Sequence, residues 1–86
     1  MDTRFRFSSD PADIDHDLVH SWLSEQSYWA QGRPRATQEQ AIDASLNYAV
    51  LDSGTGRQVA YARVVSDRAT FAWLCDVFVD PSVRGL

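Results

Sequence analysis

One carboxylate stands inside the most apolar stretch of the chain. Asp76 interrupts the run Thr70–Val79, where almost every other side chain is apolar. A carboxylate buried without a partner is energetically costly, so this side chain must be paired or put to use. It could serve as a general base or orient an amine. Alternatively, an ion pair or backbone hydrogen bonds could fix it in the strand, with Arg63 and Arg68 as candidate partners.

Two large aromatic residues fall in a loop, the segment Ser27–Ala36, which also contains a glycine and a proline. The faces of Tyr28 and Trp29 suit a cationic amine, which makes them candidates for the wall of an acceptor site. Packing over a thin core is an equally good interpretation. Arg33 and Arg35 in the same loop are expected to be solvated charges rather than ligand contacts.

The other reactive side chains have simpler interpretations. Cys75 is the sole cysteine, which excludes an intrachain disulfide, and no histidine neighbours it in the sequence. We expect a core cysteine rather than a nucleophile. His16 and His20 have the i,i+4 spacing that could start a metal site, but nothing else supplies imidazole or thiolate. A polar helix edge and no metal are predicted.

The elements that carry these residues begin with a strand and two helices. Alternation over residues 3–8 predicts a half-buried strand. Residues 15–26 have one apolar stripe, which predicts a helix capped by Asp13 or Asp15. A second helix is predicted over residues 37–46, starting at Thr37 with Gln40 in capping-box spacing. The apolar stripe of the first helix consists of Leu18, Val19, Trp22 and Leu23.

The period then changes to two, which predicts three antiparallel strands over residues 47–51, 57–66 and 70–79. Gly54 and Gly56 in the first turn can adopt the positive φ that tight hairpins need. The apolar third strand is expected to be covered on both faces. The whole order predicts an α+β fold in which helices cover a sheet.

Composition limits the classes of function. The chain has 86 residues, room for one small domain or part of one, and 44% hydrophobic residues favour a folded chain. Twelve acidic residues against eight arginines give a net charge of −4, which argues against nucleic-acid binding. No stretch resembles a membrane span or a signal peptide, so a cytoplasmic location and no membrane partner are expected.

Together with this order of elements, the segment 76–86, Asp-Val-Phe-Val-Asp-Pro-Ser-Val-Arg-Gly-Leu, resembles the GNAT acetyltransferase superfamily. GNAT enzymes have a strand that ends in a Val-x-Pro-like turn, followed by Arg/Gln-x-x-Gly-x-Gly/Ala. Arg84 matches the first position of that motif, and Gly85 and Leu86 fill the next two. The segment 27–35 is similar to a loop of small bacterial GNAT proteins. The resemblance covers residues 1–86 as the N-terminal half of a GNAT domain, interrupted within the pyrophosphate-binding loop.

The resemblance implies an acetyl-CoA-dependent N-acetyltransferase. Main-chain groups of Val77, Phe78 and Val79 would contact the pantetheine arm. Glycines and helix N–H groups after such a strand hold a pyrophosphate, and here Arg84, Gly85 and Leu86 would begin that cradle. By the same resemblance Tyr28 and Trp29 would bind the acceptor, and Asp76 is the candidate catalytic residue.

The implied partner is a small-molecule or peptide amine, and the sequence does not identify it. Because only part of the cradle is present, we expect the 86-residue chain to be inactive alone. The alternative is a non-catalytic GNAT-like remnant that serves as an oligomerisation or interaction module. A homodimer through the open edge of strand 70–79 is one such arrangement, because an uncovered apolar edge favours pairing.

Overall fold

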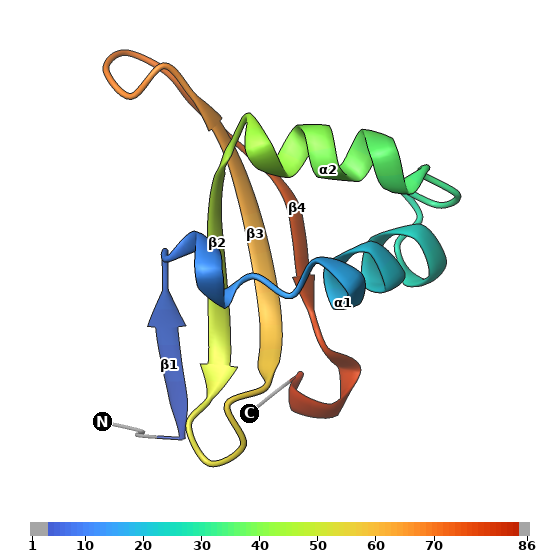
Figure 1. The fold of residues 1–86 in the computed structure, drawn as a ribbon, viewed down its shortest axis with the longest axis vertical. Coiled ribbons are helices and arrows are strands. Elements are labelled where there is room, and N and C mark those ends of the chain that lie inside the picture. Colours follow the sequence, from blue (N-terminus) through green and yellow to red (C-terminus); the bar gives the residue numbers. More distant parts are fainter. Residues whose placement is uncertain (1–3, 85–86) are drawn as a thin grey trace.

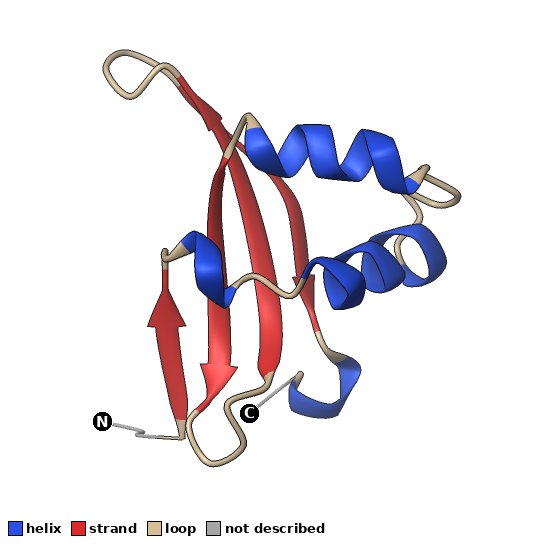
Figure 2. Ribbon diagram, in the orientation of Figure 1, coloured by secondary structure: helices blue, strands red, loops and turns tan. Residues whose placement is uncertain are grey.

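A four-stranded antiparallel sheet organises the structure, a computed structural model that describes residues 4–84. The strands lie side by side in the order β1-β2-β3-β4, and both helices cover one face of the sheet (Figures 1 and 2). The predicted α+β class is confirmed, and the N-terminal strand joins the other three in one sheet. No helix within the described residues is long and apolar enough to cross a membrane. The elements are β1 (Phe5–Ser8), α1 (His16–Ser21), α2 (Arg35–Asp43), β2 (Leu46–Asp52), β3 (Gln58–Ser66) and β4 (Ala72–Val79).

The first helix has its predicted stripe and one of its two candidate caps. Asp15 is the N-cap, and its carboxylate accepts a hydrogen bond from the Leu18 N–H at 3.1 Å. The helix continues as a π-helical turn, η2 (Trp22–Gln26). It stops at Ser27, whose hydroxyl donates to the Leu23 carbonyl at 2.6 Å. The stripe faces the sheet, with Val19, Trp22 and Leu23 buried and Leu18 packed beside them.

The second helix differs from its prediction at both ends. It begins at Arg35 directly after Pro34, which occupies the N-cap without a side-chain hydrogen bond, so the predicted capping box at Thr37 is wrong. Proline needs no N–H partner and enters in an extended conformation, which allows a helix to start immediately behind it. The helix ends at Asp43 rather than at Leu46, because Leu46 already pairs with β3.

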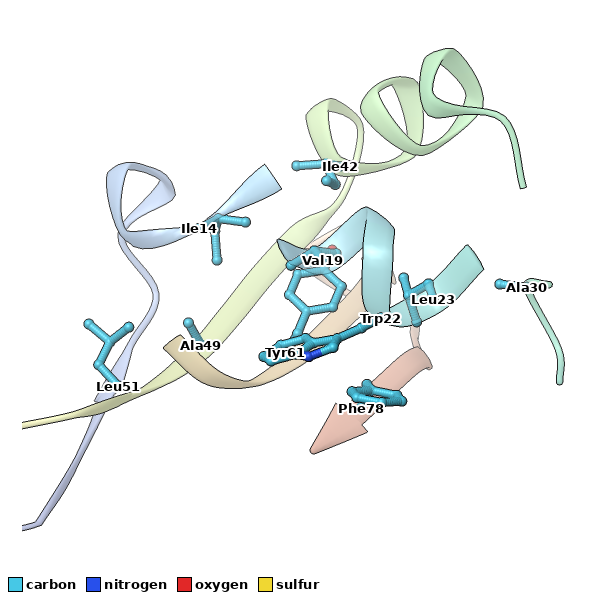
Figure 3. Close-up of a cluster of buried hydrophobic side chains, with 10 residues drawn as sticks. All are labelled: Ile14, Val19, Trp22, Leu23, Ala30, Ile42, Ala49, Leu51, Tyr61 and Phe78. Carbon is cyan, nitrogen blue, oxygen red and sulfur yellow. The ribbon is translucent and has the colours of Figure 1, made fainter. Parts of the chain in front are cut away.

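The core lies between the helices and the sheet (Figure 3). Trp22 of η2 stacks on Phe78 of β4, with ring centroids 5.2 Å apart. Tyr61 of β3 is 2% exposed, and its hydroxyl donates to the Asn47 side-chain oxygen. Burial raises the pKa of Tyr61, so its phenol stays neutral in the core. The cluster comprises Ile14, Val19, Trp22, Leu23, Ala30, Ile42, Ala49, Leu51, Tyr61 and Phe78.

A bulge distorts β4 in its middle. Tyr61 pairs with Phe78, whereas Arg63 pairs with Cys75, so two residues of β4 lie opposite one residue of β3. One of the two is Asp76, which has a φ of 50° and is buried. Such a φ is uncommon for residues other than glycine, and asparagine and aspartate tolerate it best. The bulge thereby fits a carboxylate into an otherwise apolar strand.

Strand β4 is an edge strand within residues 4–84. The prediction that it is covered on both faces is wrong. Trp73 and Leu74 are 63% and 60% exposed, and Val77 is 45% exposed. The turn between β3 and β4 extends beyond the helices in Figure 2 and is held by the Asp67 side chain, which accepts hydrogen bonds from three following N–H groups. In the β2–β3 turn Gly56 takes a positive φ, and Gly54 does not.

We expect Leu23→Ala to lower the free energy of unfolding by about 2–5 kcal/mol, because the side chain is fully buried and its removal leaves a cavity. Leu74→Ala is the matched control: the same substitution at an exposed position should change stability by less than about 0.5 kcal/mol. Urea titration followed by tryptophan fluorescence measures both. Equal losses for the two variants would contradict this placement of the core.

Candidate functional site

The Asp76 carboxylate sits at the centre of a buried polar cluster. Arg33 binds it with two nitrogens, Nη1 to Oδ2 at 2.7 Å and Nη2 to Oδ1 at 3.2 Å. Arg63 donates from Nε to Oδ2 at 2.8 Å, and the Trp29 indole N–H donates to Oδ1 at 3.1 Å. The Asp76 side chain is 2% exposed. The cluster therefore joins the loop before α2 to the two strands β3 and β4.

A second layer of contacts positions the arginines. Arg33 Nη1 also donates to the Gln38 side-chain oxygen at 2.9 Å, and Arg63 Nη1 donates to the Ser45 hydroxyl at 3.0 Å. Gln38 is fully buried on α2, and its Nε2 has no hydrogen-bond partner among the described residues. An unpaired buried amide nitrogen lowers the stability of the fold. The hydrogen bond between the Gln38 oxygen and Arg33 keeps the side chain in this position despite that cost.

The charges of the cluster decide the protonation state of Asp76. Burial alone would raise the pKa of this carboxyl, but the hydrogen bonds and charges of Arg33 and Arg63 outweigh burial and leave the pKa below its usual value. Asp76 is therefore ionised at neutral pH. A carboxylate with a lowered pKa is a weak proton acceptor, which argues against Asp76 as the general base.

The sequence found one of the two charged partners. Arg63 was a candidate and is confirmed, whereas Arg68 lies in the exposed β3–β4 turn and makes no ion pair with Asp76. The prediction that Arg33 is a solvated loop charge is wrong, since its side chain is only 19% exposed. It lies 43 positions from Asp76, and no local pattern marks such a pair. Arg35 is exposed as expected and pairs with Asp17 and Glu39.

The predicted acceptor and cofactor residues line one hollow at the end of β4. It has a volume of about 610 Å³. Tyr28 is 90% exposed and meets Trp29 edge to face, with ring centroids 5.2 Å apart. Gly85 and Leu86 lie outside the described residues. The lining consists of Gln26, Tyr28, Trp29, Val77, Phe78, Val79, Val83 and Arg84.

The turn after β4 is fixed by side chains. Arg84 donates from Nε to the Val79 carbonyl at 2.8 Å and lies over the Phe78 ring, with its guanidinium carbon 5.0 Å from the centroid. Asp80 accepts from the Ser82 N–H at 2.9 Å and pairs with Arg57 at 3.1 Å. The hydrogen bonds from Ser82 lower the pKa of Asp80, which keeps this pairing intact near neutral pH.

A second groove lies beside the first along β4, and the two share Trp29 and Val77. It has a volume of about 490 Å³. Cys75 in its lining is half-buried, and its sulfur contacts the Arg63 carbonyl at 3.4 Å, in keeping with a structural cysteine. The lining consists of Trp29, Arg33, Arg63, Trp73, Leu74, Cys75, Asp76 and Val77.

The histidines occupy the polar edge of α1, as predicted. His16 Nδ1 lies 2.6 Å from a Glu39 carboxylate oxygen, and His20 Nε2 lies 2.8 Å from the Arg33 carbonyl. Both rings thus tie α1 to the loop and helix that follow it. Within residues 4–84, no group of three or more His, Cys, Asp or Glu side chains is arranged to hold a metal ion.

Comparison with solved structures gives the decisive likeness. The chain superposes with a TM-score of 0.89 and 47% sequence identity on a crystal structure of a candidate acetyltransferase belonging to the GNAT family, from Xanthomonas campestris pv. campestris. The predicted resemblance to the GNAT family is confirmed. The match covers 94% of this chain and 56% of that one, so the chain spans little more than half the length of this relative. No protein-family model and no curated protein matches the sequence.

We expect Asp76→Asn to lower the free energy of unfolding by about 3 kcal/mol at pH 7, since it leaves two buried arginines without their anion. The folded-state pKa of Asp76 is lowered, so its ionisation stabilises the fold above pH ~4 and loses this effect as the pH falls through the lowered pKa. The stability gap between wild type and variant should therefore narrow below pH ~4.

The matched control is Asp17→Asn, which removes an exposed carboxylate and should change stability little at any pH. Urea titrations between pH 7 and pH 3 measure all three proteins. A gap for Asp76→Asn that stays constant over this range would contradict the ionised cluster.

Proposed function

We propose that this chain is part of an N-acetyltransferase that transfers the acetyl group of acetyl-CoA to an amine. The observation that carries the proposal is the close match to about half of a GNAT-family chain, and it is supported by a hollow at the end of β4 that is lined by residues predicted to bind the cofactor and the acceptor. In the reaction the amine nitrogen forms a bond to the acetyl carbon, the carbon–sulfur bond breaks, and the amine proton leaves while the CoA thiolate is protonated.

The open edge of β4 fits the pantetheine arm of acetyl-CoA. The Asp80 N–H donates inward to the Val59 carbonyl at 2.8 Å. Because successive residues of an antiparallel strand alternate between the partner strand and the open edge, the main-chain groups of Val79 face that edge. The carbonyl of Val79 is taken by Arg84, which leaves its N–H as a donor for a pantetheine amide or for the thioester oxygen.

The aromatic loop is the proposed acceptor wall. Tyr28 and Trp29 present two rings at right angles beside Val77 and Phe78, and their faces can hold an ammonium group before it loses its proton. Trp29 is anchored through its indole N–H to Asp76, so its ring has a fixed orientation. A rigid wall lowers the entropy lost when the amine is placed against the thioester.

In this proposal Asp76 positions the site rather than taking the proton of the amine. Its side chain is 2% exposed, it is held by Arg33 and Arg63, and its pKa is lowered. A base that works near neutral pH needs access to the amine and a pKa closer to 7. Asp76 instead fixes Trp29 and the arginines around the bulge, and the amine proton would pass to another group or to an ordered water.

The alternative of a non-catalytic module has one observation in its favour. Trp73, Leu74 and Val77 are exposed on an edge strand, and such an edge can pair with a second copy of the chain. A homodimer through strand 70–79 would then replace cofactor binding as the role of β4. Mass in solution separates this alternative from the enzyme.

We expect Arg84→Ala to raise the KM for acetyl-CoA about tenfold in the complete gene product, because Arg84 fixes the turn beside the proposed pyrophosphate site. Arg68→Ala, in the exposed β3–β4 turn, should leave the KM unchanged. Steady-state kinetics with an amine that the enzyme accepts give both values. If both variants matched wild type, Arg84 would have no role in the cofactor site.

The isolated 86-residue chain should show no measurable turnover, since it spans little more than half the length of its GNAT relative. Isothermal titration with acetyl-CoA, with the solution mass recorded, tests whether this chain binds the cofactor by itself and whether it forms a dimer. Weak or absent binding by a folded monomer agrees with the enzyme proposal. Turnover by this chain would refute the expectation, and a stable dimer that does not bind acetyl-CoA would favour the interaction module.

A further inference from the structure

We propose that the second groove, lined by Arg33, Arg63 and Trp73, binds a carboxylate of the amine acceptor. The acceptor class would then be amino acids with an apolar or aromatic side chain, rather than polyamines or aminoglycosides. This inference rests on the proposed acetyl transfer for its biological meaning, but the binding it describes is measurable without any reaction.

The charges that line the groove do not balance. Arg33 and Arg63 contribute two positive charges and Asp76 contributes one negative charge, and no other Arg, Lys, His, Asp or Glu of the described residues lines the groove. The groove is therefore locally positive although the chain as a whole has a net charge of −4. A single positive excess in a partly enclosed site attracts one anionic group and repels an ammonium group.

Among the charged side chains of the groove, the two arginines are more exposed than the carboxylate. The Asp76 side chain is 2% exposed, whereas the Arg33 and Arg63 side chains are 19% and 15% exposed. A guanidinium carries five N–H donors, and within the described residues Arg33 uses them in three hydrogen bonds and Arg63 in two. Donors therefore remain for a ligand oxygen, and a carboxylate is the acceptor that guanidinium groups bind best.

Apolar walls define the rest of the ligand. Trp73 and Leu74 are more than half exposed beside the arginines, and Trp29 closes the groove toward the first hollow. Low polarity around a charged pair strengthens it and offers area for an apolar side chain. Because Trp29 and Val77 line both hollows, one small molecule can place its carboxylate at the arginines and its amine toward Val77–Val79.

Three ligands that share one aromatic group and one amine test the proposal. L-Phenylalanine, L-phenylalaninamide and 2-phenylethylamine are titrated into the purified protein, followed by tryptophan fluorescence, since Trp29 and Trp73 wall the groove. We expect phenylalanine to bind at least about tenfold more tightly than either analogue. Equal affinities, no binding of phenylalanine, or a preference for an uncarboxylated amine would overturn the proposal.

Two variants change the groove charge in opposite directions. Arg33→Gln removes the positive excess and should weaken phenylalanine binding about tenfold, whereas Asp76→Asn doubles the excess and should tighten it severalfold. Loss of structure alone would weaken both. Thermal melts show whether each variant is folded. If a variant is unfolded, the three-ligand series on the wild-type protein tests the carboxylate site instead. Weaker binding in a folded Asp76→Asn variant would overturn the charge argument.

Acetyl transfer by the complete gene product is measured separately with the same three amines. Selective binding of phenylalanine without any transfer would contradict the proposed enzyme and leave the carboxylate site intact. Transfer at equal kcat/KM to phenylalanine and to 2-phenylethylamine would support the enzyme and overturn the carboxylate site.

Discussion

The buried pairing of Asp76 with Arg33 and Arg63 is the constraint on which the rest of the site depends. A carboxylate in a strand core is tolerable only with such partners, and here they come from a loop and from the neighbouring strand. Each arginine is held in turn by a residue outside the sheet, Gln38 or Ser45. The cluster thus ties the helical layer to the sheet at the point where β4 bulges.

The bulge has a consequence for the same strand. It turns Asp76 toward the helices while Trp73, Leu74 and Val77 stay exposed along the edge. Two neighbouring hollows lie along the same strand and share Trp29 and Val77. The first is proposed to hold the pantetheine arm and the amine, whereas the second carries two arginines around one carboxylate, so the two hollows differ in the groups they are proposed to bind.

Charge at the site differs from charge on the chain. Acidic residues outnumber arginines in the sequence, and that excess suggests a cationic ligand. The second groove points the other way, because its carboxylate is almost fully buried between two arginines that are themselves partly exposed. Local geometry outweighs net charge here, since interactions between exposed charges are screened over about 10 Å.

The sequence by itself determined the order of elements, the apolar stripe of α1 with an aspartate cap at residue 13 or 15, and the likeness to a GNAT half-domain, because these depend on neighbouring residues. Through that likeness it named Tyr28 and Trp29 for the acceptor and residues 77–79 for the cofactor, and it was the structure that brought these two groups to one hollow. It misplaced the start of α2, where Pro34 rather than a capping side chain sets the boundary. Only the tertiary structure paired Arg33 with Asp76 and left β4 exposed, because residues 43 positions apart meet through packing, which leaves no local pattern in a sequence.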